Sequence, residues 1–380
     1  MIVYNVPKRE KQRRGKMNIL LVTMSMQIGG AETHVLELAK GLKRLGYTVY
    51  VMSNGGDYVQ ELEANQIEHI KAPMHNRKIG NMLKSYRILK QTIKEKQISV
   101  VHAHARIPAM IAGYACKVTR TPFVTTAHGV YKVNPVLKLL TSWGERTIAV
   151  SEDVKEYVIK EYGIKEENVS VTVNGIDMNK FQKGTDYARL EAEFSQEKEK
   201  KKIVHVSRLD KETSMVAHSL ISLAENLEGI QVVIAGGGNE FDALNAEAQE
   251  VNAKLGAQRV IMAGPRTDIN QFAALADIFV GVSRAALEAM ASEKPVILAG
   301  NQGYLGIFDE SILDKALETN FCCRGFELPS SEKIERDLKK LLNGSEQSLA
   351  EMGKYNRETV KKYYSLERMI GDAVKMYESV

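Results

Sequence analysis

Cysteine, tryptophan and proline are scarce in this sequence. Among its 380 residues, 3 are cysteine, 1 is tryptophan and 8 are proline. Cys116 stands alone and Cys322 and Cys323 are adjacent, so the cysteines form neither a disulfide framework nor the spacing of a zinc site. This cysteine usage fits a reducing compartment, and we expect the protein in the cytoplasm.

Long apolar runs are also missing. No segment reaches the roughly 18 consecutive apolar residues that a membrane-spanning helix needs, and the first residues lack the apolar core of a signal peptide. With 44% apolar and 26% charged residues, the composition is that of a globular protein. The length suggests two domains.

The net charge of +5 comes from residues 1–16, which hold six lysines and arginines against one glutamate. The rest of the chain is therefore neutral, and no nucleic-acid-binding face is indicated. Three interpretations of residues 1–16 stay open: a basic tail that contacts anionic lipid, a disordered extension, or a segment upstream of a true start at Met17.

From Met17 onward, short apolar runs alternate with amphipathic stretches. The apolar runs predict strands at 18–24, 48–53, 67–72, 99–102, 123–126, 146–150, 169–173, 203–206, 231–235, 260–263, 278–282 and 296–298. Between them, helices are predicted at 32–45, 79–96, 107–118 and 134–143, and the end of the chain reads as all helical. Such alternation favours parallel sheets covered by helices on both faces.

We therefore expect an α/β protein with two doubly wound, Rossmann-like domains. The first spans 17–185, a charge-rich linker follows at 186–202, and the second spans 203–360 with a final helix at 361–380. Ligands of such sheets bind at the carboxyl ends of the strands, so function is expected in a cleft that both domains face.

The segment 276–300 predicts a strand, a tight turn, a helix and a second strand. Ser283 is the expected N-cap of the helix, and its free backbone N–H groups would favour an anion. Arg284 opposes the helix dipole and precedes Glu288 in the less favourable order of an i,i+4 pair. Either a nucleotide diphosphate compensates Arg284, with Ala285 allowing close approach and Glu288 binding a ribose, or the two residues form an ordinary surface ion pair.

This segment resembles the C-terminal half of family 4 glycosyltransferases of the GT-B fold, in which a serine turn leads into LEAMA and then PV. Those residues are here Ser283, Leu287 to Ala291 and Pro295-Val296. The family carries two glutamates eight positions apart, but Val280 stands at the first position, and a Gly-Phe-Gly loop is absent. The shortened turn resembles that of the inverting N-acetylglucosaminyl transferase that makes lipid II. The resemblance thus implies a ribose contact by Glu288 without the usual contact to the donor sugar.

Other segments match the same family in order along the chain. Arg208 corresponds to the arginine that grips the diphosphate, whereas Thr213 stands where the family has lysine, and Lys211 is the expected substitute. The resemblance also places His128 at the sugar or the leaving phosphate, and makes His128 and Arg208 the catalytic residues. The remaining expected contacts are Gly29 and Gly30 for the diphosphate or acceptor, and Gly236, Gly237, Gly264, Pro265 and Arg266, with Ser283, Arg284 and Ala285, for the donor nucleotide.

Several of these residues also have structural interpretations. Gly29-Gly30 alone is typical of a simple turn, and Arg266 can face the base or solvent. His102 and His104 are expected to be structural, because no cysteine or carboxylate cluster completes a metal site with them. The helix at 79–96 has a basic side, which is typical of a solvated face but also allows membrane contact.

The resemblance covers nearly the whole chain and implies an enzyme that moves a sugar from a UDP- or GDP-linked donor to a cell-envelope polysaccharide or lipid-linked acceptor. It implies retention of configuration, no cofactor and a final helix that returns to the first domain. No DxD triplet is present, so no metal is expected. We expect a cytoplasmic protein with peripheral contact to anionic lipid at the inner face of the plasma membrane. A sugar-nucleotide 2-epimerase and a catalytically inactive partner subunit stay open as alternatives.

Overall fold

A computed structural model describes residues 17–131, 133, 138, 140–194 and 199–380. The basic segment 1–16 and half of the helix expected at 134–143 therefore lie outside the described residues. The chain divides into two compact units. The first unit holds the residues up to Gly175 together with Leu366–Val380, and the second unit holds Ile176–Ser365.

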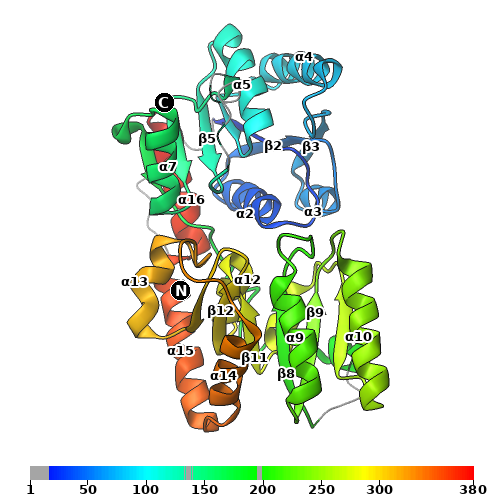
Figure 1. Ribbon diagram of the computed structural model, residues 1–380. Helices are drawn as coiled ribbons and strands as arrows, with labels where there is room; N and C mark the ends of the chain where they lie inside the picture. The colour runs from blue at the N-terminus through cyan, green and yellow to red at the C-terminus, as the bar shows by residue number, and fades with distance from the viewer. Residues whose placement is uncertain (1–16, 132, 134–137, 139, 195–198) are drawn as a thin grey trace. The chain divides into compact units, whose positions relative to one another are not determined.

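The first unit is built on a seven-stranded sheet in the order β3-β2-β1-β4-β5-β6-β7 (Figure 1). Each neighbouring pair of strands is parallel. The strands are β1 (Asn18–Val22), β2 (Thr48–Ser53), β3 (Glu68–Lys71), β4 (Val100–Ala103), β5 (Phe123–Ala127), β6 (Arg146–Ala149) and β7 (Val169–Val171). The helices are α2 (Gly30–Arg44), α3 (Val59–Ala64), α4 (Ile79–Glu95), α5 (Arg106–Thr119), α7 (Glu152–Tyr162) and the short η1 (Glu166–Asn168).

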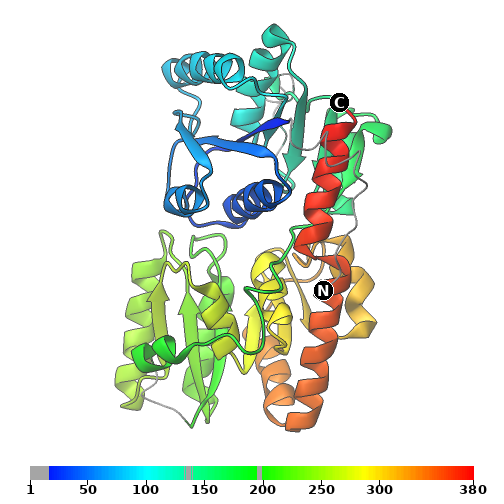
Figure 2. The same ribbon diagram turned by 180° about the vertical axis from the view of Figure 1, so that it is seen from behind.

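The last helix of the chain, α16 (Leu366–Glu378), belongs to the first unit (red in Figure 2). Gly41 lets it lie close against α2, because a Cβ atom at Gly41 would come within 2.0 Å of Ile370 Cδ1. The hydroxyl of Tyr377 is 2.7 Å from Nδ1 of His102 at the end of β4. Residues far apart in the sequence thus share one core.

The second unit holds a six-stranded sheet in the order β10-β9-β8-β11-β12-β13. Its strands are β8 (Lys201–Val206), β9 (Ile230–Ala235), β10 (Val260–Gly264), β11 (Ile278–Gly281), β12 (Val296–Gly300) and β13 (Gly303–Ile307). Its helices are α8 (Ala188–Phe194), α9 (Met215–Asn226), α10 (Phe241–Leu255), α11 (Ile269–Leu275), α12 (Ser283–Ala291), η2 (Glu310–Ile312), α13 (Leu313–Glu318), α14 (Ser331–Leu342) and α15 (Glu346–Tyr363). Figure 1 shows α9 and α10 side by side over this sheet.

The α/β fold class and every predicted strand are confirmed, with shifts of one or two residues at most ends. The prediction of parallel sheets is wrong at one edge, since β13 pairs antiparallel with β12. Strand β13 was not predicted, because it contains two glycines and follows β12 after two residues, without a helix between them. No helix in the described ranges is long and apolar enough to cross a membrane.

Candidate functional site

A cavity of about 270 Å³ lies in the first unit, at the carboxyl ends of its central strands. Strand β1 is hydrogen-bonded to both β2 and β4, so the order of the sheet reverses between β1 and β4. Ligands of doubly wound sheets bind at this kind of position. The lining residues are Met24, Arg77, Ala103, His104, Ala105, Arg106, Ile107, Ala109, Met110, Thr125, Thr126, Ala127, His128, Gly129, Tyr131, Thr141 and Trp143.

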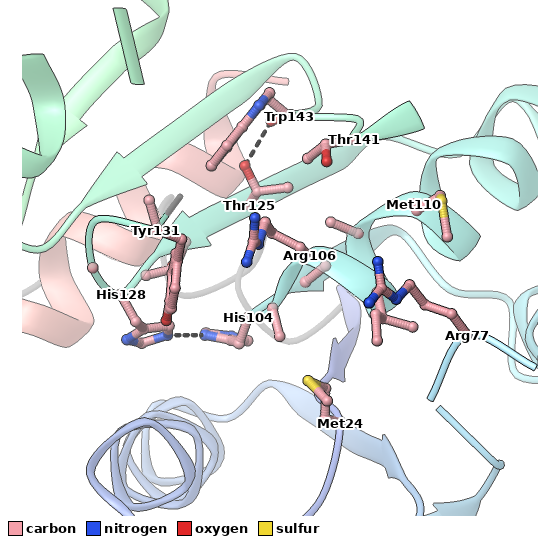
Figure 3. A pocket seen from close by; sticks show the side chains of 17 residues that line it. Met24, Arg77, His104, Arg106, Met110, Thr125, His128, Tyr131, Thr141 and Trp143 are labelled. Carbon is pink, nitrogen blue, oxygen red and sulfur yellow. Dashed lines mark hydrogen bonds between the residues drawn. The ribbon is translucent and has the colours of Figure 1, made fainter. Parts of the chain in front are cut away.

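Two arginines give this cavity a positive character (Figure 3). The Arg106 guanidinium lies 4.6 Å from the centre of the Tyr131 ring, a cation–π contact that holds it at the wall. Arg77 reaches the cavity from the segment before α4. Methionine, isoleucine and alanine side chains make up much of the remaining wall. This lining suits a ligand with an anionic group attached to a less polar part.

Four histidines gather at the ends of β4 and β5. The ring centres of His102 and His104 are 4.0 Å apart, and Nδ1 of His104 lies 3.2 Å from Nε2 of His128. His34, from α2, packs edge-on against His128 with ring centres 4.9 Å apart. His102 is held on both sides, because its Nε2 lies 2.7 Å from Oγ1 of Thr126 and its Nδ1 reaches Tyr377. This agrees with the structural role expected for His102.

Burial keeps His102, His104 and His128 neutral at physiological pH. It lowers the pKa of His102 to about 3 and the pKa of His128 to about 4. Burial also holds the pKa of His104 well below its ordinary value, and the neighbouring His102 acts in the same direction. His128, which is half-buried at the wall of the cavity, can therefore donate a hydrogen bond as a neutral ring.

The expected glycines at the first crossover do not line this cavity. Gly29 is the N-cap of α2 in an extended conformation, and its carbonyl oxygen accepts a hydrogen bond of 2.8 Å from the hydroxyl of Thr33. A Cβ atom at Gly30 would meet nothing within 4 Å. The space beside the backbone at the start of α2 is therefore open. A phosphate or sugar would need such a space to reach the backbone N–H groups.

In the second unit, the order of the sheet reverses between β8 and β11, which are paired in parallel. Arg208 follows β8 and Ser283 follows β11, so the structure brings these two predicted segments to neighbouring strand ends. The Arg208 side chain is 65% exposed and lies 3.8 Å from the Asp210 carboxylate. An exposed, weakly paired arginine at this position is available to an anionic ligand.

Thr213 has a defined role in the loop that carries Arg208. Its hydroxyl donates to the carbonyl oxygen of Arg208 at 2.6 Å, and it accepts from the backbone N–H of Asp210 at 3.2 Å. The backbone N–H of Lys211 donates to Oδ1 of Asn239 in the next loop. Thr213 therefore shapes the loop and supplies no cation, which leaves Arg208 and Lys211 as its basic side chains.

The glycine turn after β9 lies so close to neighbouring loops that side chains at these positions would clash with them. A Cβ atom at Gly236, which has φ +152°, would come within 1.9 Å of the Ser207 carbonyl oxygen. At Gly238 it would meet the Leu209 backbone at 2.3 Å, and at Gly237 it would meet Pro265 at 2.7 Å. These glycines let the loops after β8, β9 and β10 pack together. Gly264, with φ +69°, ends β10 beside them.

Arg266 is engaged with acidic residues of its own unit. It makes ion pairs with Asp268 at 2.7 Å and with Glu193 of α8 at 2.9 Å, and its side chain is 17% exposed. Its guanidinium also lies 5.3 Å from the ring of Phe272. The hydrogen bonds to Asp268, the strongest influence, raise the pKa of Arg266. These contacts tie α8 to the loop after β10 and favour a structural role over contact with a base.

The prediction that Ser283 caps α12 is wrong. The N-cap is Val282, and Ser283 is the first helical residue with a left-handed φ of +55°. Its backbone N–H donates to the carbonyl oxygen of Phe321 at 2.7 Å, a contact from a distant segment that holds this strained conformation. One of the N–H groups expected to bind an anion is thus used by the protein.

Arg284 and Glu288 form a buried ion pair. Nε of Arg284 donates to Oε1 of Glu288 at 2.8 Å, and the two side chains are only 10% and 8% exposed. The expected pairing is present, but the interpretation as a surface pair is wrong. A buried pair of this kind is a fixed polar group at the end of β11, next to Ala285 in the first turn of α12.

Sequence reasoning missed several residues of the first unit. Arg77, Arg106 and Tyr131 line the cavity, and His34 joins the histidine cluster. His34 lies four residues after Gly30 in the GGAETH segment, about one helical turn away. This spacing was the only feature of the sequence that pointed to His34 as a site residue. The contacts that unite these residues come from segments far apart in the chain.

Comparisons with known proteins agree on both halves of the chain. The family model "Glycosyltransferase Family 4" matches residues 28–180, and "Glycosyl transferases group 1" matches residues 187–359. EpsD of Bacillus subtilis (strain 168) is 25% identical over 300 residues, which are 70% of this chain and 74% of EpsD. The UDP-Gal:alpha-D-GlcNAc-diphosphoundecaprenol alpha-1,3-galactosyltransferase of Escherichia coli is 26% identical over 245 residues, 58% of this chain and 62% of that protein.

Solved structures show the same fold. A glycosyltransferase from Rickettsia africae ESF-5 superposes with a TM-score of 0.77 at 22% identity, covering 96% of this chain and 98% of its own. HepE of Anabaena, crystallised with UDP and glucose, superposes with a TM-score of 0.76 at 18% identity, covering 96% of this chain and 100% of HepE. The fold is GT-B.

Proposed function

Because the chain belongs to the family 4, group 1 glycosyltransferases, we propose that it transfers a sugar from a nucleoside-diphosphate donor to a lipid-linked acceptor. One observation carries the donor assignment: Arg208 and the start of α12 lie at neighbouring strand ends where the order of the second sheet reverses. The complex of HepE with UDP and glucose supports a uridine nucleotide as donor.

Arg208 is the proposed electrostatic partner of the departing diphosphate. A guanidinium can engage two phosphate oxygens at once, and it stabilises the charge that develops as the bond to the sugar breaks. Glu288 is proposed to accept hydrogen bonds from the ribose, with Arg284 holding its carboxylate at 2.8 Å. His128 is proposed to donate a hydrogen bond to the sugar or the leaving phosphate. Lys211 adds a second cation on the loop of Arg208.

The cavity of the first unit is the proposed acceptor site. Arg77 and Arg106 would bind the phosphate of a lipid-linked acceptor, and the apolar wall would contact the less polar remainder. The Escherichia coli relative supports this class, since its name specifies a diphosphoundecaprenol-linked sugar as acceptor. Transfer is proposed to retain configuration and to need neither metal nor cofactor.

Peripheral membrane contact is part of the same proposal. Helices α4 and α5 are neighbours, and each exposes apolar side chains: Ile79 is 76% and Leu83 is 52% exposed, and Tyr114 is 56% and Val118 is 59% exposed. Around them α4 carries a single acidic residue, Glu95, and α5 carries none. Basic, partly apolar helices of this kind suit the anionic inner face of the plasma membrane, where a lipid-linked acceptor would reside.

Calorimetric titration with UDP, GDP and ADP, followed by product analysis with each nucleotide sugar and a diphosphate-linked acceptor lipid, tests the proposal. We expect binding of one nucleotide and a new glycosidic product. Arg208→Ala should weaken nucleotide binding by about 1 to 3 kcal/mol without loss of stability, because the side chain is exposed. Glu288→Gln should weaken it similarly, with its fold checked by urea unfolding.

Lys254→Ala, at the far end of α10, is the control and should bind as the wild type does. Unchanged nucleotide affinity in both site variants would contradict the donor assignment. Release of free nucleotide without an acceptor would identify an epimerase instead, and no binding of any nucleotide would identify an inactive scaffold.

A further inference from the structure

The histidine cluster of the first unit has the donor set of a metal site. We propose that His34, His104 and His128 bind a late first-row divalent ion such as Zn²⁺, and that the bound ion takes His128 out of sugar transfer. The second half of this statement rests on the proposed function, whereas the first half stands on the residues alone.

The three rings come from three different elements at one edge of the sheet. His34 lies in α2, His104 follows β4, and His128 follows β5. One ring nitrogen from each residue lies within 4.8 Å of the other two. Zn²⁺ binds imidazole at about 2.0–2.1 Å, which places ligand nitrogens of a tetrahedral site about 3.3 Å apart. A small inward rotation of the rings therefore completes three ligands.

The contacts around the rings are those of a prepared site. Nδ1 of His34 lies 3.1 Å from Oδ1 of Asn174, and such a hydrogen bond fixes the orientation of a ligand ring. His104 is 2% exposed, and among the residues that the structure describes none is a hydrogen-bond partner of its buried Nε2. With the ring proton on Nε2, His104 presents the lone pair of Nδ1 toward His128, and Nδ1 is the nitrogen that an ion shared with His128 would bind.

The donor type selects the kind of ion. Within the residues that the structure describes, the group consists of imidazoles and includes no carboxylate or cysteine. Neutral imidazoles suit Zn²⁺, Cu²⁺ and Ni²⁺, whereas Mg²⁺, Ca²⁺ and Mn²⁺ prefer oxygen ligands. The site would therefore be distinct from any magnesium site at a diphosphate.

The cavity gives the ion an entrance, since His104 and His128 both line it (Figure 3). Nδ1 of His104 and Nε2 of His128 now face each other at 3.2 Å, and an ion bound by these rings would draw on the same nitrogens. The bound ion would occupy Nε2 of His128, so a hydrogen bond from this nitrogen to the sugar or phosphate would be lost. Zinc occupancy is thus expected to inhibit transfer.

The test uses the full-length protein, treated with chelator and desalted. Titration with Zn²⁺ should show about one equivalent bound per chain, and Co²⁺ should produce the visible absorption of a nitrogen-ligated, low-coordinate site. His34→Gln should weaken Zn²⁺ binding at least tenfold and remove the Co²⁺ spectrum. His218→Gln, at a histidine on α9 in the second unit, is the matched control and should bind Zn²⁺ as the wild type does.

Because His34 is buried, the far-ultraviolet circular dichroism of His34→Gln is compared with that of the wild type, and His104→Gln serves as a second variant. No stoichiometric binding, or equal Zn²⁺ affinity in the wild type and in folded variants of the trio, would overturn the site. Either result would mean that the three histidines are held only by hydrogen bonds between their rings and bind no ion.

Inhibition is measured separately. One equivalent of Zn²⁺ should suppress transfer by the wild type, while His34→Gln, which keeps His128, should need at least tenfold more. Stoichiometric binding without inhibition would overturn the second half only. If no acceptor yields a product at all, the proposed function fails, and the binding and Co²⁺ measurements still decide the metal site.

Discussion

Thr213 shows how one residue changes the chemistry of a loop. Its hydroxyl donates to the carbonyl oxygen of Arg208 at 2.6 Å and accepts from the backbone N–H of Asp210, so it fixes the turn that presents Arg208. A lysine at this position would add a charge but could not accept that hydrogen bond. The proposed donor site therefore depends more heavily on Arg208 than it would if the loop carried both cations.

His205 makes stability depend on pH. The residue is 3% exposed, with Nδ1 lying 2.7 Å from the carbonyl oxygen of Val280 and Nε2 lying 2.8 Å from the hydroxyl of Ser207. A carbonyl oxygen can only accept, so Nδ1 carries the proton and Nε2 accepts from Ser207. Burial lowers the pKa of His205 to about 4, below the value of about 6.5 in the unfolded chain.

The sign of the effect follows from proton binding. Between pH 6.5 and 4 the unfolded chain holds a proton that folded His205 does not, so stability is complete above pH 6.5 and falls as the pH is lowered. We expect His205 to account for about 1 to 2 kcal/mol of the loss in unfolding free energy between pH 7 and pH 5. Urea unfolding at both pH values measures it.

His205→Asn, which can still donate to Val280, should lose that share of the pH dependence. His218→Gln, at a more exposed histidine, should keep it. The other buried histidines contribute equally to all three proteins. Equal pH slopes in the wild type and His205→Asn would rule out this account of His205.

Single residues also mark the limit of sequence reasoning. The position of Arg208 after a strand and the pairing of Arg284 with Glu288 could be predicted, because local spacing determines both. The cluster of His34 with His104 and His128 could not, since these residues are brought together only when α2, β4 and β5 are assembled. The burial of the Arg284–Glu288 pair likewise depends on what covers α12.

At the scale of elements, the prediction from sequence failed at the start of α12 and at strand β13. A serine before a helical run is typical of an N-cap, yet Ser283 enters the helix at φ +55° because its N–H donates to Phe321, 38 positions further along the sequence. Strand β13 has weak strand propensity and forms because β12 offers it an edge. Both features are set by tertiary contacts, whereas the strands with continuous apolar runs were predictable.

Helix α4 is the element that we expect to meet the membrane. Ile79 and Leu83 lie one turn apart and are 76% and 52% exposed, with Lys84 and Arg87 exposed beside them. Replacing both apolar residues in Ile79→Ser/Leu83→Ser should reduce partitioning onto vesicles with anionic lipid about tenfold, because buried apolar side chains contribute on the order of 1 kcal/mol each at an interface. Sedimentation with vesicles of phosphatidylglycerol and phosphatidylcholine measures the bound fraction.

The matched control for α4 is Leu328→Ser, at an exposed leucine in the second unit. It removes a similar apolar side chain and should leave partitioning unchanged. Binding of the wild type should also weaken as salt is raised, since exposed charges are screened within about 10 Å at 0.1 M. Equal binding to anionic and purely zwitterionic vesicles, or no effect of the double substitution, would argue against this face.

At the scale of the whole molecule, both sheets are doubly wound, and this topology explains where the candidate residues lie. Each sheet reverses its strand order once, between β1 and β4 in the first unit and between β8 and β11 in the second. Alternating strands and helices in the sequence were sufficient to predict this architecture. The arginine-lined cavity of the first unit was not predictable, because its wall draws on five separate segments and one of them precedes α4.

The division of the chain makes the first unit depend on the last residues. Helix α16 buries Leu366, Met369, Ile370, Ala373, Val374, Met376 and Tyr377, and Tyr377 contacts His102 at the end of β4. Fully burying an aliphatic or methionine side chain is worth about 1.5 to 3 kcal/mol, so these residues together rival the marginal stability of a domain. A chain that ends after Ser365 should therefore lose the fold of the first unit while the second unit keeps its own.

Hydrogen–deuterium exchange of the full chain and of the chain ending at Ser365 tests this dependence. We expect the amides of β1, β4 and α2 to lose protection in the shortened chain, and those of β8, β9 and β12 to keep it, because α16 belongs to the first unit. Tyr377→Phe, which removes only the hydroxyl that meets His102, should cost about 1 to 3 kcal/mol and leave both units folded. Full protection of α2 in the shortened chain would show that the first unit is stable without its terminal helix.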